Sequence, residues 1–194
     1  LIPDQRRTQT FAWYNLSGSF ATALGALAGG WLSQALQTTG FSPFDSYRAV
    51  LVGYALGGIA LLLLFQGLSA AIEVPASQWQ PAARRTLGLH RSRRVIFRLS
   101  ALFALDAFAG GLVVQSMVAY WFYVRFGVSA GVIGSIFFGA NLLAGVSALL
   151  AGRLAKKIGL INTMVFTHIP SNLLLMLVPL MPTLPLAILV LLLR

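Results

Sequence analysis

Asp106 is the residue whose chemistry stands out first, because it is the only acid between Glu73 and the C-terminus. It lies in the apolar stretch ALFALDAFAGGLVVQSMVAYWF, residues 101–122. An Asp at the centre of a membrane helix costs roughly 2.5–3.5 kcal/mol on insertion scales, and such residues usually face a bundle interior or a water-filled pathway. Two interpretations stay open. Asp106 either couples proton or substrate movement to a conformational change, or forms a structural ion pair with an Arg on another helix.

Helical spacing places four further residues on the same face as Asp106, namely Gly110, Val113, Met117 and Tyr120. Residues three and four apart are neighbours on a helix surface. We therefore take Asp106, Gly110, Met117 and Tyr120 as candidates for a substrate or proton pathway.

Asn141 is a second polar residue within an apolar run. It lies on a stripe of small residues with Gly134 and Gly145. Small residues let membrane helices approach closely, and Asn side chains can hydrogen-bond across such contacts. We expect Asn141 to bond to a neighbouring helix, with a place in the pathway as the alternative.

His168 and Asn172 flank Pro170 in the sequence FTHIPSNLL. Proline removes a backbone donor and disturbs a helix, which leaves carbonyls that need partners. We expect His168 and Asn172 to shape the region around the Pro170 kink. A substrate- or proton-linked role is the alternative.

The composition identifies the class of protein around these residues. Of the 194 residues, 58% are hydrophobic and 9% are charged, and the mean hydropathy is +0.82. Soluble domains carry roughly 25% charged residues. The apolar runs are about twenty residues long, enough for a helix to cross a bilayer core of ~30 Å. The sequence therefore predicts an all-α polytopic transmembrane helical bundle, embedded in the lipid bilayer.

The composition also excludes several kinds of site. The chain has no Cys and two His far apart, so we expect no metal site and no cofactor. The net charge of +10 comes from short clusters between apolar runs. Single-strand binders instead interleave basic and aromatic residues in a groove, so we expect no nucleic-acid partner.

The apolar runs predict five spans and the start of a sixth, at residues 11–36, 47–71, 97–124, 129–151, 161–180 and from about Thr183. Turn signals separate them at QTTGFSPFDSYR, FGVSAG, GRLAKKIG and PLMPTLP. The chain starts at Leu1 and ends in an apolar run too short to span, so we expect a fragment truncated at both ends.

Basic residues predict the orientation. The segment before the first span carries two, the 72–98 segment six and the 152–160 segment three, eleven in all, against Arg48 and Arg125 on the opposite side. Basic loops stay on the cytoplasmic side. We expect 72–98 and 152–160 to be cytoplasmic, and 37–47 and 180–184 to face outward.

The first span also has a stripe of small residues. Gly18, Gly25, Gly29 and Gly30 lie in NLSGSFATALGALAGGWL, and Gly25 to Gly29 is a GxxxG pair. Such pairs pack membrane helices closely. We expect the Gly25–Gly29 face to contact another helix.

Two motifs resemble those of the major facilitator superfamily. GRLAKKIG resembles its cytoplasmic G-x-L-a-D-r-x-G loop motif, and GALAGG, residues 25–30, resembles its G-P-x-x-G-G signature. Lys156 stands at the acidic position of the first motif, and Ala26 at the proline of the second. The gating-loop residues are Gly152, Arg153, Leu154, Lys156, Lys157 and Gly159.

The resemblance implies two six-helix halves joined by a long cytoplasmic loop. Residues 1–71 would then be the last two helices of the first half, 72–96 the linker and 97–194 the first four helices of the second half. It implies a secondary transporter of a small solute that works by alternating access. Proton coupling, a monomeric state and a plasma (inner) membrane location complete this interpretation.

Two other classes of function, a membrane enzyme and a channel, would require different sequence features. An intramembrane enzyme would need a nucleophile and base, such as Ser17 or Ser19 with His168, but nothing in the sequence supports that geometry and the HExxH pattern is absent from it. A channel would need a selectivity filter, and no TVGYG-like segment occurs. We therefore expect a transporter and no enzymatic activity.

Overall fold

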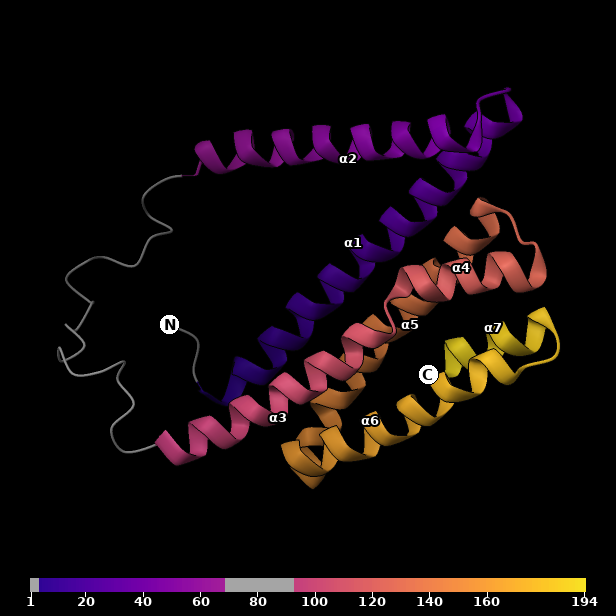
Figure 1. The fold of residues 1–194 in the computed structure, drawn as a ribbon. Coiled ribbons are helices and arrows are strands. Elements are labelled where there is room, and N and C mark those ends of the chain that lie inside the picture. The colour runs from indigo at the N-terminus through magenta and orange to yellow at the C-terminus, as the bar shows by residue number, and fades with distance from the viewer. Residues whose placement is uncertain (1–3, 69–92) are drawn as a thin grey trace. The chain divides into compact units, whose positions relative to one another are not determined.

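The computed structural model describes residues 4–68 and 93–194, and every regular element in these two ranges is a helix. The elements are drawn in Figure 1. In chain order they are α1 (Asp4–Thr38), α2 (Pro43–Gln66), α3 (Arg93–Leu112), α4 (Gln115–Phe126), α5 (Ala130–Ile158), α6 (Leu160–Leu177), the 3-10 turn η4 (Val178–Leu180) and α7 (Leu184–Leu193). The prediction of an all-α helical protein is confirmed.

Three helical segments in the described ranges are long and apolar enough to cross a membrane: Pro43–Gln66, Ala130–Ile158 and Leu160–Leu180. They match the second, fourth and fifth predicted spans. α1 is 35 residues long, about 52 Å at 1.5 Å per residue. It is not among the three because Gly, Ser and Thr dilute its apolar residues. The stretch Ile96–Leu105 of α3 and the helix α7 are apolar but shorter.

The predicted turns at QTTGFSPFDSYR, FGVSAG and PLMPTLP are confirmed, whereas GRLAKKIG is helical as far as Ile158, because α5 continues through it. Gly40, after α1, has φ of 100°, and Gly127, after α4, has φ of 64°. These are left-handed conformations that glycine adopts without steric cost. The predicted linker 72–96 is too long by four residues, because α3 begins at Arg93. Arg is a good helix former, and its stem can lie along apolar surface while its charge stays in water. Residues 72–92 of the linker lie outside the described residues.

The start of α2 follows from the sequence SPFD, residues 42–45. The Ser42 Oγ accepts a hydrogen bond from the Asp45 N–H at 3.1 Å and donates to the Asp45 carboxylate at 2.7 Å. Pro43 occupies the first helical position, where its missing N–H has no cost. A Ser cap with an acid three residues later stabilises a helix start, so α1 and α2 are separated by a short, well-defined turn.

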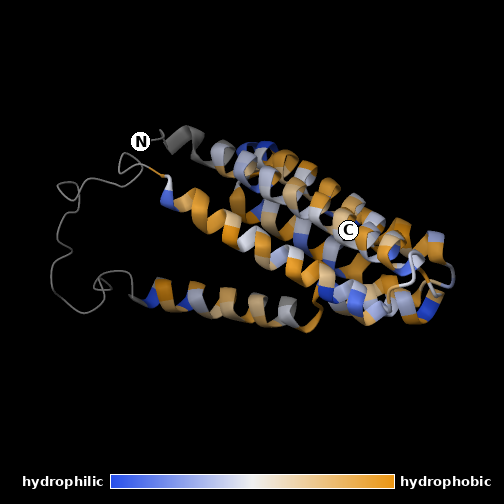
Figure 2. Cartoon of the chain, turned by 90° about the horizontal axis from the view of Figure 1, so that it is seen from above, coloured by the Kyte–Doolittle hydropathy of each residue, from blue (hydrophilic) through white to orange (hydrophobic). Residues whose placement is uncertain are grey.

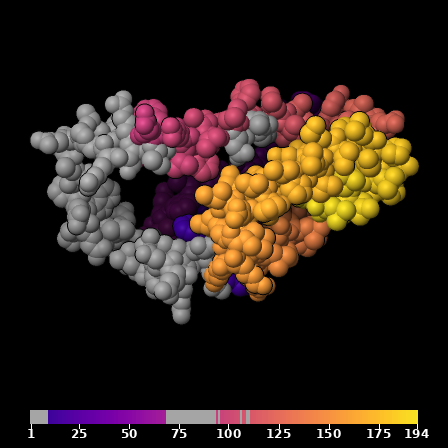
Figure 3. Space-filling model, turned by 90° about the horizontal axis from the view of Figure 1, so that it is seen from below, coloured from indigo at the N-terminus to yellow at the C-terminus, as the bar shows by residue number. Residues whose placement is uncertain are grey.

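The chain divides into two compact units, one made of the residues up to Leu51 with Ala119–Arg194, the other of Val52–Val118. In the first unit α1 packs on α5, and α5 contacts α6 and α7. The α6–α7 segment is the orange and yellow surface of Figure 3. The buried apolar residues of the first unit are Ala12, Ala23, Phe122, Val128, Ile136, Phe137, Val178, Ala187 and Leu191. The first unit therefore combines helices from before and after the 72–96 linker.

The second unit contains the rest of α2, α3 and the first residues of α4. Its large apolar side chains are exposed, among them Leu61, Leu64 and Phe103. Figure 2 shows hydrophobic, orange residues recurring along the helices, with pale and blue residues between them. Soluble proteins rarely expose apolar patches of this extent, so these surfaces are those of helices that lie among lipid and other membrane helices.

Candidate functional site

The third predicted span, 97–124, is not one continuous helix. α3 ends at Leu112 and α4 begins at Gln115, with Val113 and Val114 between them in non-helical conformation. The predicted face assumed unbroken helical spacing and is therefore wrong beyond Leu112. Asp106 and Gly110 lie in α3, before the break, and their surroundings lie outside what the structure describes.

Met117 and Tyr120 lie after the break, in α4, and their side chains are exposed. The Val114 carbonyl accepts hydrogen bonds from the backbone N–H groups of Met117, at 3.0 Å, and Val118, at 3.4 Å. These hydrogen bonds form the first turn of α4, which is therefore a separate helix from α3.

The break has a local cause in the sequence. Gly110 and Gly111 are poor helix formers, each roughly 1 kcal/mol worse than Ala, and the two β-branched residues that follow lose rotamer freedom in a helix. A helix that stops and restarts leaves backbone N–H and C=O groups without helical partners. Within a membrane such groups are tolerated only where protein or a water-filled cavity surrounds them. The break therefore marks a position that faces protein or water.

The closest helix–helix packing in the described residues joins α1 and α5, and we call this contact the α1–α5 seam. A Cβ added at Gly134 would lie 2.6 Å from the Ala26 carbonyl oxygen and 3.0 Å from the Gly30 Cα. A Cβ at Gly145 would lie 3.0 Å from the Ser19 Cβ. At Gly134 the obstacles are helix backbone, which a larger side chain would have to displace, and at Gly145 the Leu16 and Ser19 side chains would have to move by a few tenths of an ångström. The seam therefore needs its glycines.

The register of the seam is regular and antiparallel. Ala12 lies beside Gly152, Ser19 beside Gly145, and Gly30 beside Gly134. The steps along α1 are seven and eleven residues, and the same steps run backwards along α5. The basic first turns of α1 and the basic end of α5 therefore lie at the same end of the pair, as the predicted alternation of charged segments requires.

The α1 face that contacts α5 is not the Gly25–Gly29 face. A Cβ at Gly18 or Gly25 would meet nothing within 4 Å, and one at Gly29 would meet Val50 of α2 at an ordinary 3.7 Å. Gly30 is the predicted packing residue that the seam uses. α1 carries two small-residue stripes, and the spacing rule cannot tell which one meets a neighbour. The described contacts place Ser19, Ala26 and Gly30 in the seam, while packing of the Gly25–Gly29 face against another helix stays a prediction.

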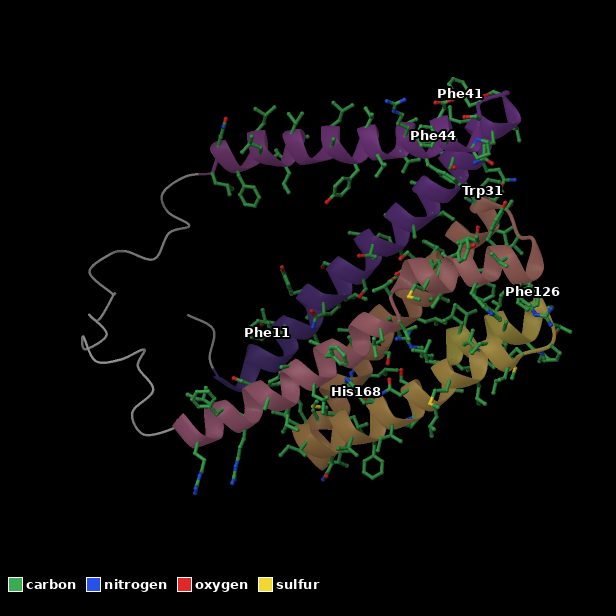
Figure 4. All side chains as sticks on the ribbon, viewed as in Figure 1. Phe11, Trp31, Phe41, Phe44, Phe126 and His168 are labelled. Atoms are coloured by element: carbon green, nitrogen blue, oxygen red, sulfur yellow. The ribbon has the colours of Figure 1, made fainter. Side chains whose placement is uncertain are left out.

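Polar contacts hold one end of the seam, and both backbone groups of Gly131 take part in them. The Gly131 N–H donates to Gln34 Oε1 at 2.9 Å. The Gly131 carbonyl accepts from Ser135 Oγ at 3.0 Å, and that hydroxyl in turn accepts from Trp31 Nε1 at 3.0 Å. Figure 4 shows Trp31 near the end of α1. We call Trp31, Gln34, Gly131 and Ser135 the Gly131 clasp.

A second polar cluster ties α1 to α2 at the same end. The hydroxyls of Ser33 and Ser46 are buried and lie 3.3 Å apart. Gln37 Nε2 donates to both, at 3.2 Å to Ser33 and 2.9 Å to Ser46. Ser46 Oγ also donates to the Pro43 carbonyl at 2.7 Å. The cluster is fully hydrogen-bonded, so its role is to hold the α1–α2 hairpin.

Asn141 does not make the predicted hydrogen bond to another helix. Its Nδ2 donates to the Phe137 carbonyl of its own helix at 2.8 Å. The seam register places Ala23 opposite Asn141, because each lies four residues from the Ser19–Gly145 pair. Ala23 is fully buried and has no polar side-chain atom to offer. The Asn141 amide therefore finds its hydrogen-bond acceptor within α5, since its neighbour across the seam is apolar.

His168 does not repair the Pro170 kink in the predicted way. Pro170 leaves the Phe166 carbonyl without its helical donor, but the His168 Nδ1 lies 3.1 Å from the Met164 carbonyl. His168 and Asn172 are both exposed; His168 is labelled on α6 in Figure 4. Back-bonds of this kind bend helices, so His168 acts on the turn before Pro170.

His168 belongs to a series of polar side chains along the first half of α6. Asn162 Nδ2, Thr163 Oγ1 and Thr167 Oγ1 each donate to the carbonyl four residues earlier, at 2.8–2.9 Å. No spacing or motif in the sequence identifies these three residues as a group. Their hydrogen-bonding capacity is used within the helix, so they do not form a ligand site in this structure.

The gating-loop motif spans the end of α5 and the start of α6. Gly159 has φ of 86° and its N–H donates to the Ala155 carbonyl at 3.0 Å, which ends α5 and lets α6 start at once. Gly152 faces Ala12 of the seam, where an added Cβ would lie at an ordinary 3.6 Å. The side chains of Arg153, Leu154, Lys156 and Lys157 are exposed. The motif thus forms the basic last turns of α5 and the Gly159 joint to α6, at the end of the seam away from the clasp.

Among the residues that the structure describes, no three His, Cys, Asp or Glu side chains gather where they could hold a metal ion. The polar residues that the structure does bring together, in the Gly131 clasp and around Ser46, were not predicted. Trp31 and Gln34 are separated by one helical turn, but nothing in that spacing identifies a partner on a helix a hundred residues later.

Comparison with known proteins indicates the family to which the chain belongs. The Major Facilitator Superfamily model matches residues 1–193. The chain is 24% identical over 218 residues to a Saccharomyces cerevisiae protein described as "Uncharacterized membrane protein YJR124C". That alignment covers 97% of this chain and 49% of the yeast protein, so the chain spans about half the length of this relative. No solved structure gave a significant match. With the helical fold and the glycine seam, the match over nearly the whole chain shows that this chain belongs to the major facilitator superfamily.

Proposed function

We propose that the full-length protein is a secondary active transporter that moves a small solute across a membrane by alternating access. One observation carries the proposal: the α1–α5 seam joins a helix from before the 72–96 linker to a helix from after it, in a chain of this family. Transporters that alternate access rock one repeat against another around a central site. A close, side-chain-poor seam between the two segments suits such a motion.

The seam has the properties that a rocking contact needs. Between Ala12 and Gly30 its close contacts are made by glycine, alanine and serine together with Leu16, and no ion pair among the described residues would have to break. Small residues keep the backbones close and leave no long side chains to interlock. The two helices can therefore tilt on one another while they remain in contact. In this proposal residues 1–71 and 97–194 belong to the two halves.

The broken third span supports a substrate or ion pathway near Asp106. Discontinuous helices supply unpaired backbone groups at membrane depth, and transporters use such groups at their binding sites. Asp106 lies six residues before the end of α3. We propose that it couples proton or substrate movement to the conformational cycle. The full-length protein is proposed to work as a monomer in the plasma (inner) membrane.

The test is a flux measurement on the full-length protein in proteoliposomes, with empty liposomes as the control. A panel of small solutes is offered with and without an imposed proton gradient. A transporter gives saturable uptake of at least one solute, released unchanged. Flux that does not saturate would identify a channel, and a chemically altered solute would identify an enzyme; either result contradicts the proposal.

A further inference from the structure

The N-terminus of α5 is capped by a residue from another helix. Ser129 is the N-cap residue of α5, and its backbone, with φ of −71° and ψ of 162°, has the extended conformation that capping requires. Its side chain nevertheless makes no capping hydrogen bond. The Gly131 N–H, one of the donors that a Ser cap normally satisfies, instead donates to Gln34 Oε1 of α1. α5 therefore has two acceptors available for one N–H.

Gly131 has no side chain because the clasp occupies that space. A Cβ added there would lie 2.7 Å from Gln34 Oε1 and 3.2 Å from the Trp31 ring. The α1 side chains thus lie directly on the Gly131 backbone. The rest of the seam, from Ala26 to Ala12, makes close contacts without any hydrogen bond from one helix to the other among the described residues. In the part of the pair whose side chains the structure describes, hydrogen bonds between the two helices therefore occur at the clasp end.

We propose that the Gly131 clasp is a latch that works by exchange of the α5 cap. While α1 and α5 are closed at this end, Gln34 caps Gly131 and Trp31 bonds to Ser135. When this end of the seam opens, the Gly131 N–H loses its hydrogen bond to Gln34 Oε1 and donates to the Ser129 hydroxyl instead. The replacement cap lowers the cost of opening, because no N-terminal donor is left bare. The latch thus has two defined states and can switch between them.

This inference rests on the proposed function, since it assigns the latch to the alternating cycle, and it predicts opposite effects for two substitutions. Gln34→Leu removes a bond made only in the closed state and so favours opening. Ser129→Ala removes a bond made only in the open state and so favours closure. A residue that merely stabilises the fold would not give effects of opposite sign on one conformational equilibrium.

The reporter is a cysteine at Ala23, which is fully buried in the seam. This part of the chain contains no other cysteine, and any in the rest of the full-length protein are replaced. The protein is placed in nanodiscs, where both faces are accessible, and the rate of modification by a water-soluble maleimide is measured. The rate follows the fraction of time that the seam is open, and it needs no knowledge of the solute.

Gln34→Leu and Trp31→Phe should each raise the labelling rate about three- to twenty-fold, the range that a membrane helix–helix hydrogen bond supports. Ser129→Ala should lower it about fivefold, the usual effect of a lost Ser cap. Thr22→Ala is the matched control, because Thr22 bonds only to the Gly18 carbonyl within α1 at 2.9 Å. It should leave the rate unchanged.

Trp31→Phe keeps the latch testable if Gln34→Leu fails to fold, because it removes one N–H and little volume. The latch is overturned if the labelling rate of the folded clasp variants equals that of Thr22→Ala, or if Ser129→Ala raises it. Failure of the proposed function is separate: it appears as absence of saturable flux in the proteoliposome assay. Unchanged labelling together with normal flux would reject the latch alone.

Discussion

Gly30 of α1 and Gly134 of α5 meet backbone to backbone, so that a Cβ added to Gly30 would lie 2.8 Å from the Gly134 Cα and 2.6 Å from the Ala130 carbonyl oxygen. Both obstacles are backbone atoms of a helix, which cannot rotate away as a side chain can. The contact is therefore set by the absence of side chains at two positions more than a hundred residues apart.

Gly30→Ala should lower the stability of the full-length protein by about 1–2 kcal/mol. Overpacking a tight contact costs about 1–3 kcal/mol, and the better helix propensity of Ala offsets roughly 0.5–1 kcal/mol of this. Gly25→Ala is the control on the same helix, because an added Cβ there meets nothing within 4 Å. It should be neutral or slightly stabilising. Thermal unfolding followed by size-exclusion chromatography measures the stability of both variants. Equal stability of the two would contradict the close contact between Gly30 and Gly134.

Ser46→Ala should destabilise the α1–α2 hairpin. It deletes the acceptor that Gln37 Nε2 reaches at 2.9 Å and the partner of the buried Ser33 hydroxyl. A buried polar group left without its partner costs about 1–3 kcal/mol. Ser17→Ala is the matched control, because Ser17 is exposed and bonds to the Trp13 carbonyl of its own helix at 3.1 Å. A loss of stability in the control as large as in Ser46→Ala would show that the cluster has no special role.

The helices themselves could be predicted from the sequence because their signals are local. Long apolar runs predict spans, and Gly40 and Gly127 predict turns, so the bounds of α2, α5 and α6 came out within a few residues for most ends. The break at Val113–Val114 could not be predicted in the same way. It contains no proline, and the stretch around it is as apolar as the rest of the span, so hydropathy alone favours one continuous helix.

The contacts between helices were harder to predict, because they depend on which face meets which neighbour. Asn141 shows the difficulty: it was correctly placed among small residues, but its hydrogen bond goes to Phe137 in its own helix. A side-chain amide can donate to a carbonyl of its own helix as well as to a group on a neighbouring helix. Which of the two bonds forms depends on the residue opposite. Gln34 shows the reverse case, since its partner is a backbone N–H that any residue could have supplied.

The orientation predicted from the basic residues gives a third test. Cysteines placed at Lys156 and Thr39 should react differently with an impermeant thiol reagent added to intact cells. Thr39 lies in the exposed turn between α1 and α2 and should be labelled from outside; Lys156 lies in the basic last turn of α5 and should be protected until the membrane is permeabilised. Thr39 is preferred to Gly40, whose φ of 100° would strain a cysteine. Labelling of Lys156→Cys but not of Thr39→Cys in intact cells would reverse the orientation.

The final prediction concerns Asp106 in α3, before the broken turn. Asp106→Asn keeps the size of the side chain and removes its charge and its exchangeable acid proton. If Asp106 couples a proton to transport, the full-length variant should be expressed normally and should bind or exchange solute across the membrane, but should no longer concentrate solute in response to a proton gradient. The measurement is uptake in proteoliposomes at several values of pH, with and without the gradient.

The outcome separates the two interpretations of this acid. A structural ion pair leaves an Arg unpartnered when the acid is lost, and breaking a buried pair costs about 3–5 kcal/mol, so the variant should then be poorly expressed or unstable. Asp106→Glu provides the matched control, because it retains the acid and should preserve gradient-driven uptake at least in part if coupling is the role. A stable Asp106→Asn variant that still concentrates solute in response to the gradient would exclude coupling through this residue.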